Sequence, residues 1–201
     1  SDILAVLLSK PCFEGISQKE LAEQIEAKKK CRDKLPTWFE KTGIYYPNKL
    51  HMEQTSSEIT SQYKAELVNG KSLIDLTGGF GVDSLYFSQK VTQIVHCEIH
   101  QKLSEIAAHN FKVLERENVT CKPVDGIAYL EQSDQSFDWI FIDPSRRDDA
   151  KGKVFLLEDC HPDVSKFLPL FFKKAAHLLI KTSPLLDIKQ AMETLESVKE
   201  I

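Results

Sequence analysis

Acidic side chains follow the predicted strands of this chain at the places where chemistry is expected. Asp75, Glu98, Asp125 and Asp143 each end or directly follow a short apolar segment with the character of a buried strand. The carboxyl ends of parallel strands meet at one edge of a sheet, where ligands bind. Carboxylates gathered there repel one another by about a few kcal/mol unless a cation or hydroxyl donors meet them. The spacing therefore indicates a site for a ligand that carries positive charge or hydroxyl groups.

A glycine-rich loop follows the first of these acids. From Asp75 to Asp83 the chain reads D-L-T-G-G-F-G-V-D, with Gly78, Gly79 and Gly81 between a strand and a predicted helix. Glycine lets the backbone approach a ligand closely, and a helix start offers unpaired N–H groups. The loop lacks the third glycine of G-x-G-x-x-G, and its two acids would repel the pyrophosphate of a dinucleotide. These features favour S-adenosylmethionine, which carries a sulfonium and an ammonium but no phosphate; a dinucleotide and a glycine turn without a ligand are the alternatives.

Strands and helices alternate after residue 70, which predicts a parallel sheet with crossover helices, an α/β Rossmann-like fold. The predicted strands are 72–76, 93–98, 119–124, 138–142 and 176–181. The predicted helices lie near 82–90, 101–117, 126–132 and 162–175, and a last helix begins at about 187 and continues to Ile201. Together these elements place the acids at one edge of the sheet.

The first 50 residues are predicted to form an N-terminal helical subdomain with a connector, and residues 51–201 a ligand-binding domain. Helical segments are expected within 2–34. Residues 52–58 lead into a further helix that is expected to run through Ile59, Tyr63, Leu67 and Val68, and Asn69-Gly70 is expected to close it.

The connector carries aromatic residues, Trp38, Tyr45 and Tyr46. Such residues stack on bases in RNA-binding proteins, but a cluster of this kind more often seals the seam between packed elements, and the second interpretation is favoured. The basic run at 28–32 offers a contact for a polyanion, although a solvated helix end is its more common role.

Composition narrows the class of protein. The chain has 201 residues and a net charge of −4, so a polyanion would need a local basic patch. Its five cysteines are an odd number without C-x-x-C spacing, which argues against disulfides or a zinc site. Alternation along a strand would scatter His96, Glu98 and His100 over two faces, so no metal is expected. No apolar run is long enough to span a membrane and no signal peptide is visible, which predicts a cytoplasmic protein.

Residues from about 50 to 190 resemble the class I S-adenosylmethionine-dependent methyltransferases. The resemblance rests on the glycine loop, the acid of the second strand, and Asp143-Pro144 after the fourth. It implies that Glu98 holds both ribose hydroxyls and that Asp125, with Gly126 beside it, meets the adenine amino group. Thr77 stands at the place of the family's first glycine. The residues implied around the amino-acid part of the cofactor are Asp75, Thr77, Gly78, Gly79, Gly81 and Asp83, with Gln54 and Ser56 closing over its methionine end.

The motif Asp143-Pro144-Ser145-Arg146-Arg147 is similar to the D-P-P-type segment of RNA and base methyltransferases. Together with E-Q-T-S-S-E at 53–58 and Tyr63-Lys64, it resembles bacterial candidate methyltransferases with a THUMP-like domain and, more distantly, trimethylguanosine synthases. The resemblance implies an RNA substrate and in-line methyl transfer to a base nitrogen, with Asp143 and Pro144 beside the reacting atoms. Arg146 and Arg147 are expected to grip substrate phosphate, since a guanidinium matches phosphate geometry. A surface loop in which Asp148 and Asp149 neutralise both arginines is an equal alternative.

Sheets of this family usually close with a further C-terminal hairpin, so the resemblance also implies that the chain is a fragment without it. Two other functions stay open: a catalytically inactive cofactor-binding adaptor of an RNA-modifying assembly, and a nucleotide-dependent oxidoreductase. The RNA species, the methylated atom and the oligomeric state are not determined by the sequence.

Overall fold

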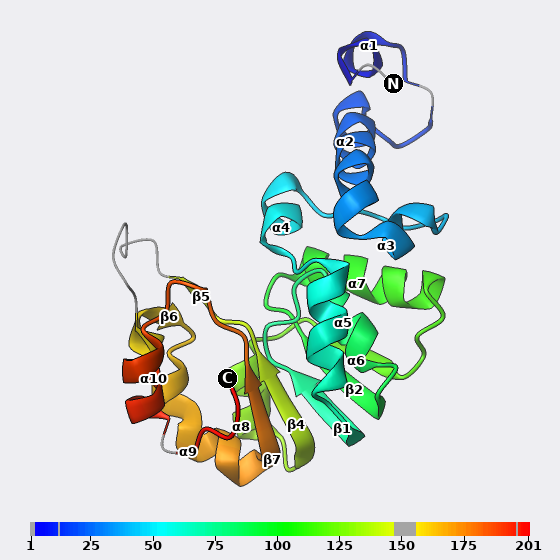
Figure 1. The fold of residues 1–201 in the computed structure, drawn as a ribbon. Helices are drawn as coiled ribbons and strands as arrows, with labels where there is room; N and C mark the ends of the chain where they lie inside the picture. Colours follow the sequence, from blue (N-terminus) through cyan, green and yellow to red (C-terminus); the bar gives the residue numbers. More distant parts are fainter. Residues whose placement is uncertain (1–2, 12, 147–155, 196) are drawn as a thin grey trace.

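The computed structural model describes residues 3–11, 13–146, 156–195 and 197–201. Its centre is a five-stranded parallel sheet with the strand order β3-β2-β1-β4-β7 (Figure 1). The strands are β1 (Gly70–Asp75), β2 (Val91–Cys97), β3 (Val119–Lys122), β4 (Phe137–Ile142) and β7 (Ala175–Ile180). The predicted α/β Rossmann-like sheet is confirmed, and each predicted strand lies within a few residues of an observed one.

Helices cover both faces of the sheet, which explains why neighbouring residues at the ends of β1 and β4 are all buried. Neighbouring residues of β1 point to opposite faces, so Leu73 joins one hydrophobic cluster and Ile74 the other. Helices α6 (Val82–Phe87) and α7 (Gln101–Val113) contribute to the first cluster, together with Ala65 of α5 (Glu58–Glu66). Helices α8 (Gly126–Gln132) and α9 (Val164–Lys174) contribute to the second.

The strand order changes direction between β1 and β4. From β1 the chain moves outward to β2 and β3, and it then returns to the other side of β1 as β4 and β7. In open α/β sheets ligands bind outside the carboxyl ends of the strands at such a switch point. Asp75 ends β1 and Asp143 directly follows β4, so these acids lie at the switch point.

The N-terminal helices are α1 (Ile3–Leu8), α2 (Gln18–Lys34), α3 (Pro36–Glu40) and α4 (Lys49–Gln54). Helices α1 and α2 extend away from the sheet, while α3 and α4 lie beside the elements that cover it (Figure 1). Trp38 and Tyr46 are buried against Phe80 of the glycine loop, with ring centroids 4.6 and 6.4 Å away. Both aromatics therefore seal the seam, as favoured, while the Tyr45 hydroxyl donates to Glu20 at an exposed position. The proposed domain boundary at residue 50 stays a prediction.

Two features around residues 49–70 differ from expectation. The short helix α4 was not predicted. The helix expected through Ile59 and Tyr63 is α5, which begins after Ser57 because the side chain of Ser57 accepts from the Thr60 N–H. Its expected cap at Asn69-Gly70 is replaced by Leu67, and Gly70 opens β1 with a φ of 121°.

The end of the chain also differs from expectation. The last helix, α10 (Ile188–Thr194), ends well before Ile201. A short antiparallel pair, β5 (Ser145–Arg146) and β6 (Cys160–His161), was not predicted, nor was the one-turn helix η1 (Leu157–Asp159).

Candidate functional site

Packing beneath the glycine loop explains two of its glycines. A Cβ atom on Gly78 would lie 2.1 Å from Cε1 of His96, and one on Gly81 would lie 2.6 Å from Cζ of Phe111. Gly81 also has a φ of 92°, which a side chain rarely allows. Gly79, with a φ of 56°, has open space where its Cβ would be. The loop is therefore pressed closely onto β2 and α7 at Gly78 and Gly81.

We expect the Gly78→Ala variant to lose about 3 kcal/mol or more of unfolding free energy, because the added methyl would lie 2.1 Å from a buried imidazole ring. Denaturant unfolding monitored by circular dichroism measures this. Gly79→Ala is the matched control in the same loop, since it meets only the left-handed backbone cost of about 1–2 kcal/mol. If Gly78→Ala is no more destabilising than Gly79→Ala, the loop does not sit as tightly as the structure has it.

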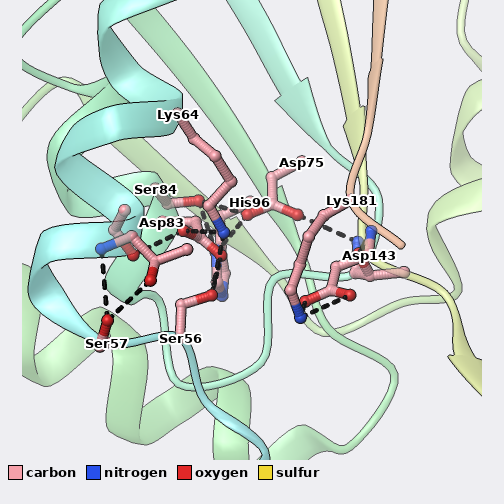
Figure 2. A network of polar contacts seen from close by, with 12 residues as sticks. Ser56, Ser57, Lys64, Asp75, Asp83, Ser84, His96, Asp143 and Lys181 are labelled. Carbon is pink, nitrogen blue, oxygen red and sulfur yellow. Dashed lines mark hydrogen bonds and ion pairs between the residues drawn. The ribbon is translucent and has the colours of Figure 1, made fainter. Parts of the chain in front are cut away.

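Asp75 lies beneath the loop rather than at its outer surface. Its carboxylate accepts the Thr77 N–H at 3.1 Å and the Ser84 hydroxyl at 2.7 Å, and Ser84 Oγ is 3.1 Å from Nδ1 of His96 (Figure 2). Burial raises the pKa of Asp75 to about 7 and lowers the pKa of His96 to about 4. Asp75 therefore holds the glycine loop in this structure, and its contact with the cofactor stays a prediction.

A buried ion pair joins α5 to α6. Lys64 Nζ is 2.5 Å from Asp83 Oδ1, and the carboxylate also accepts the hydroxyls of Ser56 at 2.9 Å and Ser61 at 2.6 Å. In Figure 2, Lys64 reaches from α5 toward Asp83 and Ser56. Two predicted cofactor residues, Asp83 and Ser56, are therefore bonded to each other. Gln54, at the end of α4, is exposed.

The structure brings the acid of the second strand to the glycine loop. Glu98 Oε2 accepts the Gly79 N–H at 3.0 Å, while Oε1 accepts the His100 N–H at 2.7 Å and lies 2.8 Å from its Nδ1. The ring of His51, from α4, is 5.6 Å from that of His100. Burial lowers the pKa of His51, and repulsion from His100 acts in the same direction.

The residues predicted beside adenine have structural roles as well. Asp125 is exposed and caps α8, accepting the Ala128 N–H at 2.9 Å. A Cβ on Gly126 would lie 2.3 Å from the carbonyl oxygen of Leu76, so only glycine allows α8 to begin this close to the loop.

Asp143 has a direct cationic partner. Lys181, which follows β7, places Nζ 2.8 and 3.1 Å from the two carboxylate oxygens (Figure 2). The Asp143 N–H donates to Thr77 Oγ1 at 2.7 Å, so β4 is tied to the glycine loop. Burial raises the pKa of Asp143, and Lys181 opposes that shift. Pro144 is half-buried, Arg146 ends β5, and Arg147 lies outside the described residues.

Sequence reasoning assigned no role to Ser61, Lys64, Ser84 or Lys181. Lys64 follows Ser61 by three positions and Ser57 by seven, so helical periodicity would have placed these polar residues on one face. Lys181 stood at the end of the fifth predicted strand, which was the signal for its place at the rim.

Two hollows lie elsewhere on the molecule. One of about 850 Å³ is lined by β2, β3 and α8, and another of about 50 Å³ lies between η1, α9 and α10. Neither is lined by the glycine loop. Within the described ranges, His, Cys, Asp and Glu form no group of three or more suited to a metal ion. The helices in those ranges are too short or too polar to cross a membrane.

Comparison with known proteins places this fold. No family model and no curated protein matches the chain. The structure resembles that of a candidate methyltransferase from Porphyromonas gingivalis W83, with a TM-score of 0.85 and 28% identity over 96% of this chain. The chain spans 48% of the length of that protein. The sheet and its helices are thus those of a Rossmann-like methyltransferase fold.

Two more distant structures share the fold. An S-adenosylmethionine-dependent O-methyltransferase from Thermotoga maritima matches with a TM-score of 0.51 and 17% identity, over 73% of this chain and 53% of its own. Precorrin 8W decarboxylase from Methanobacterium thermoautotrophicum matches with a TM-score of 0.52 and 15% identity, over 76% and 73%.

Proposed function

We propose that this chain is an S-adenosylmethionine-dependent methyltransferase. One contact carries the proposal: the carboxylate of Glu98 accepts the N–H of Gly79. A dinucleotide would need that N–H for its pyrophosphate, and the carboxylate both occupies the donor and repels the phosphate. A cationic, phosphate-free adenosine derivative meets no such conflict. The similarity to the P. gingivalis candidate methyltransferase supports the same class.

The acids near the loop can accept hydrogen bonds from the donor groups of this cofactor. Glu98 would take the ribose hydroxyls, since a carboxylate has two oxygens at the separation of a vicinal diol. When the ribose binds, Glu98 would give up its contact with Nδ1 of the exposed His100 and accept the ribose hydroxyls instead. Asp125, whose Oδ1 caps α8, would meet the adenine amino group with Oδ2, beside Gly126. The backbone from Thr77 to Gly81 would lie along the amino-acid part, with Ser56 and Gln54 near its methionine end.

When bound, the cofactor would supply a methyl group activated by its sulfonium, and the electron pair of the C–S bond would remain on sulfur. The chain's own residues mainly position and orient the reactants. Asp143 would accept a hydrogen bond from the attacking N–H and fix the nitrogen in line. Pro144, with its fixed φ, would keep the following carbonyls near the same place.

We expect the Glu98→Ala variant to bind S-adenosylhomocysteine about tenfold more weakly or worse, because a charge-assisted bond to each ribose hydroxyl is worth about 1.5–3 kcal/mol. Isothermal calorimetry measures this, with Glu105→Ala on the exposed face of α7 as the control. The affinity for the 2′-deoxy analogue should fall much less between the native protein and the variant. An equal loss for both ligands would contradict the ribose role.

The same calorimetry separates the classes of function. Binding of NAD in place of S-adenosylhomocysteine would overturn the proposed class and favour the oxidoreductase. Transfer of a radiolabelled methyl group into total RNA separates an enzyme from an inactive adaptor.

An RNA base nitrogen is the substrate we propose, on the resemblance of Asp143-Pro144-Ser145-Arg146-Arg147 to the segment of RNA methyltransferases. Arg146 and Arg147 are proposed to bind phosphate of that RNA. The likeness to proteins with a THUMP-like domain and to trimethylguanosine synthases supports the same substrate class. Mass spectrometry of RNA nucleosides from cells with and without the protein tests it: loss of one methylated nucleoside would identify the target, and an unchanged set would contradict an RNA substrate.

A further inference from the structure

The ion pair between Lys181 and Asp143 occupies the carboxyl ends of two neighbouring strands. The Lys181 N–H donates to the Ile142 carbonyl at 2.9 Å, so the backbone of the residue after β7 is fixed against β4. From there the side chain returns to both oxygens of Asp143, at 2.8 and 3.1 Å. The side chains of Asp143 and Lys181 are 25% and 34% exposed, so the pair lies at the surface of the rim and not deep within the core.

The surroundings make Lys181 the cation that matters most for this carboxyl. Burial raises the pKa of Asp143, Lys181 and then Lys64 lower it, and Asp83 raises it. Among the residues that the structure describes, the charged groups that act on Asp143 are Lys181 after β7, Lys64 from α5 and Asp83 from α6. Lys64 is itself bound to Asp83 at 2.5 Å, so its charge is largely balanced there. Within the described ranges, Lys181 is the cation that bonds to Asp143 directly.

The bonds to Lys181 leave the Asp143 carboxylate with further acceptor sites. A carboxylate offers about four lone-pair sites, and one ammonium contacting both oxygens leaves part of them available. The Asp143 backbone is held separately by its N–H bond to Thr77 Oγ1. Lys181 thus fixes the side chain while Thr77 fixes the main chain.

We propose that Lys181 is a positioning residue of the methyl-transfer site, which keeps the Asp143 carboxylate charged and in one orientation so that it accepts the N–H of the substrate nitrogen. The inference rests on the proposed function for the role of Asp143 as an acceptor. A protonated Asp143 would instead present an O–H and lose the acceptor site facing the nitrogen. Without Lys181, burial would favour that protonated form.

Carboxyl-carbon NMR of protein labelled at aspartate tests the ion pair without any assay of activity. The Asp143 signal is the one missing from the Asp143→Asn variant. We expect it to titrate at higher pH in Lys181→Met than in the native protein, and to return toward the native position in Lys181→Arg. Lys166→Met is the matched control, because Lys166 pairs with Asp163 at 3.1 Å on the surface of α9, away from the site. It should leave the Asp143 signal unchanged.

Activity then tests the role. The rate of methyl transfer into total RNA, divided by the native rate at the same pH, should be about tenfold lower at pH 6 than at pH 9 in Lys181→Met. Lys181→Arg should restore most of the lost rate. Binding of S-adenosylhomocysteine should change little. An Asp143 signal that titrates alike in native and Lys181→Met proteins would overturn the inference, as would an activity loss that is equal at all pH values.

If Lys181→Met does not fold, Lys181→Gln takes its place in the same comparison, since it also removes the charge and keeps a polar side chain. An Asp143 signal that titrates alike in native protein and in Lys181→Gln would overturn the pairing. Failure of S-adenosylhomocysteine to bind native protein would refute the proposed function instead, while the NMR result would still decide the ion pair.

Discussion

Methyl transfer into RNA should fall about 100-fold or more in the Asp143→Ala variant, with little change in the affinity for S-adenosylhomocysteine. The reason is that Asp143 accepts a bond from the reacting nitrogen, and loss of one such preorganised contact typically costs about 10²–10³ in rate. Its backbone N–H bond to Thr77 survives the substitution, so the loop should keep its place. Radiolabelled transfer measures the rate and calorimetry measures the affinity.

The control for this variant is Asp134→Ala, at an exposed position before β4 with no part in the site. It should have native activity and native affinity. Asp143→Asn adds a sharper comparison, because the amide keeps the shape of the side chain but loses the charge that Lys181 holds. Turnover that is unchanged in Asp143→Ala would remove this residue from the mechanism.

The Lys64→Met variant should be destabilised by about 3–5 kcal/mol, the typical result of removing one partner from a buried ion pair. The side chains of Lys64 and Asp83 are only 7% and 12% exposed, so solvent cannot replace the lost ammonium. Denaturant unfolding measures the change. The loss is expected to be large because Asp83 would remain buried with only hydroxyl donors from Ser56 and Ser61.

Two further variants make this result specific. Lys64→Met combined with Asp83→Asn should recover part of the lost stability, since the uncompensated charge is gone. Lys90→Met removes a surface pair with Glu66 of 2.7 Å and should cost no more than about 1 kcal/mol. Equal losses of unfolding free energy in Lys64→Met and Lys90→Met would show that the buried pair contributes no more stability than the surface pair.

The sheet was predictable from sequence because strands alternate with helical segments after residue 70 and an acid ends or closely follows each of the first four strands. Asp75 and the glycines after it fixed the first strand and its turn, and Asp143-Pro144 fixed the end of the fourth. The helix around residues 58–66 was harder. Ile59 and Tyr63 formed its apparent apolar stripe, yet they are 78% and 65% exposed, because the buried face of α5 instead carries Ser61, Lys64 and Ala65.

The partners of the predicted acids were not predictable, and the cause is physical. A sequence shows that carboxylates meet at one edge, but whether each faces a ligand or a donor of the protein depends on long-range packing. Asp83 pairs with Lys64, which lies 19 positions earlier, and Asp143 pairs with Lys181, which lies 38 positions later. Glu98, the acid of the second strand, bonds to the Gly79 N–H of the glycine loop, and its contact with the ribose hydroxyls stays a prediction.

Phe80 stands between Gly79 and Gly81, and its ring packs on Trp38 and Tyr46. The loop is therefore anchored from outside the sheet by residues that precede it by more than thirty positions. Removal of the segment that carries Trp38 and Tyr46 would expose the Phe80 ring to water and leave the loop without this packing. Thermal melting should accordingly release the N-terminal helices and the loop in a single cooperative step.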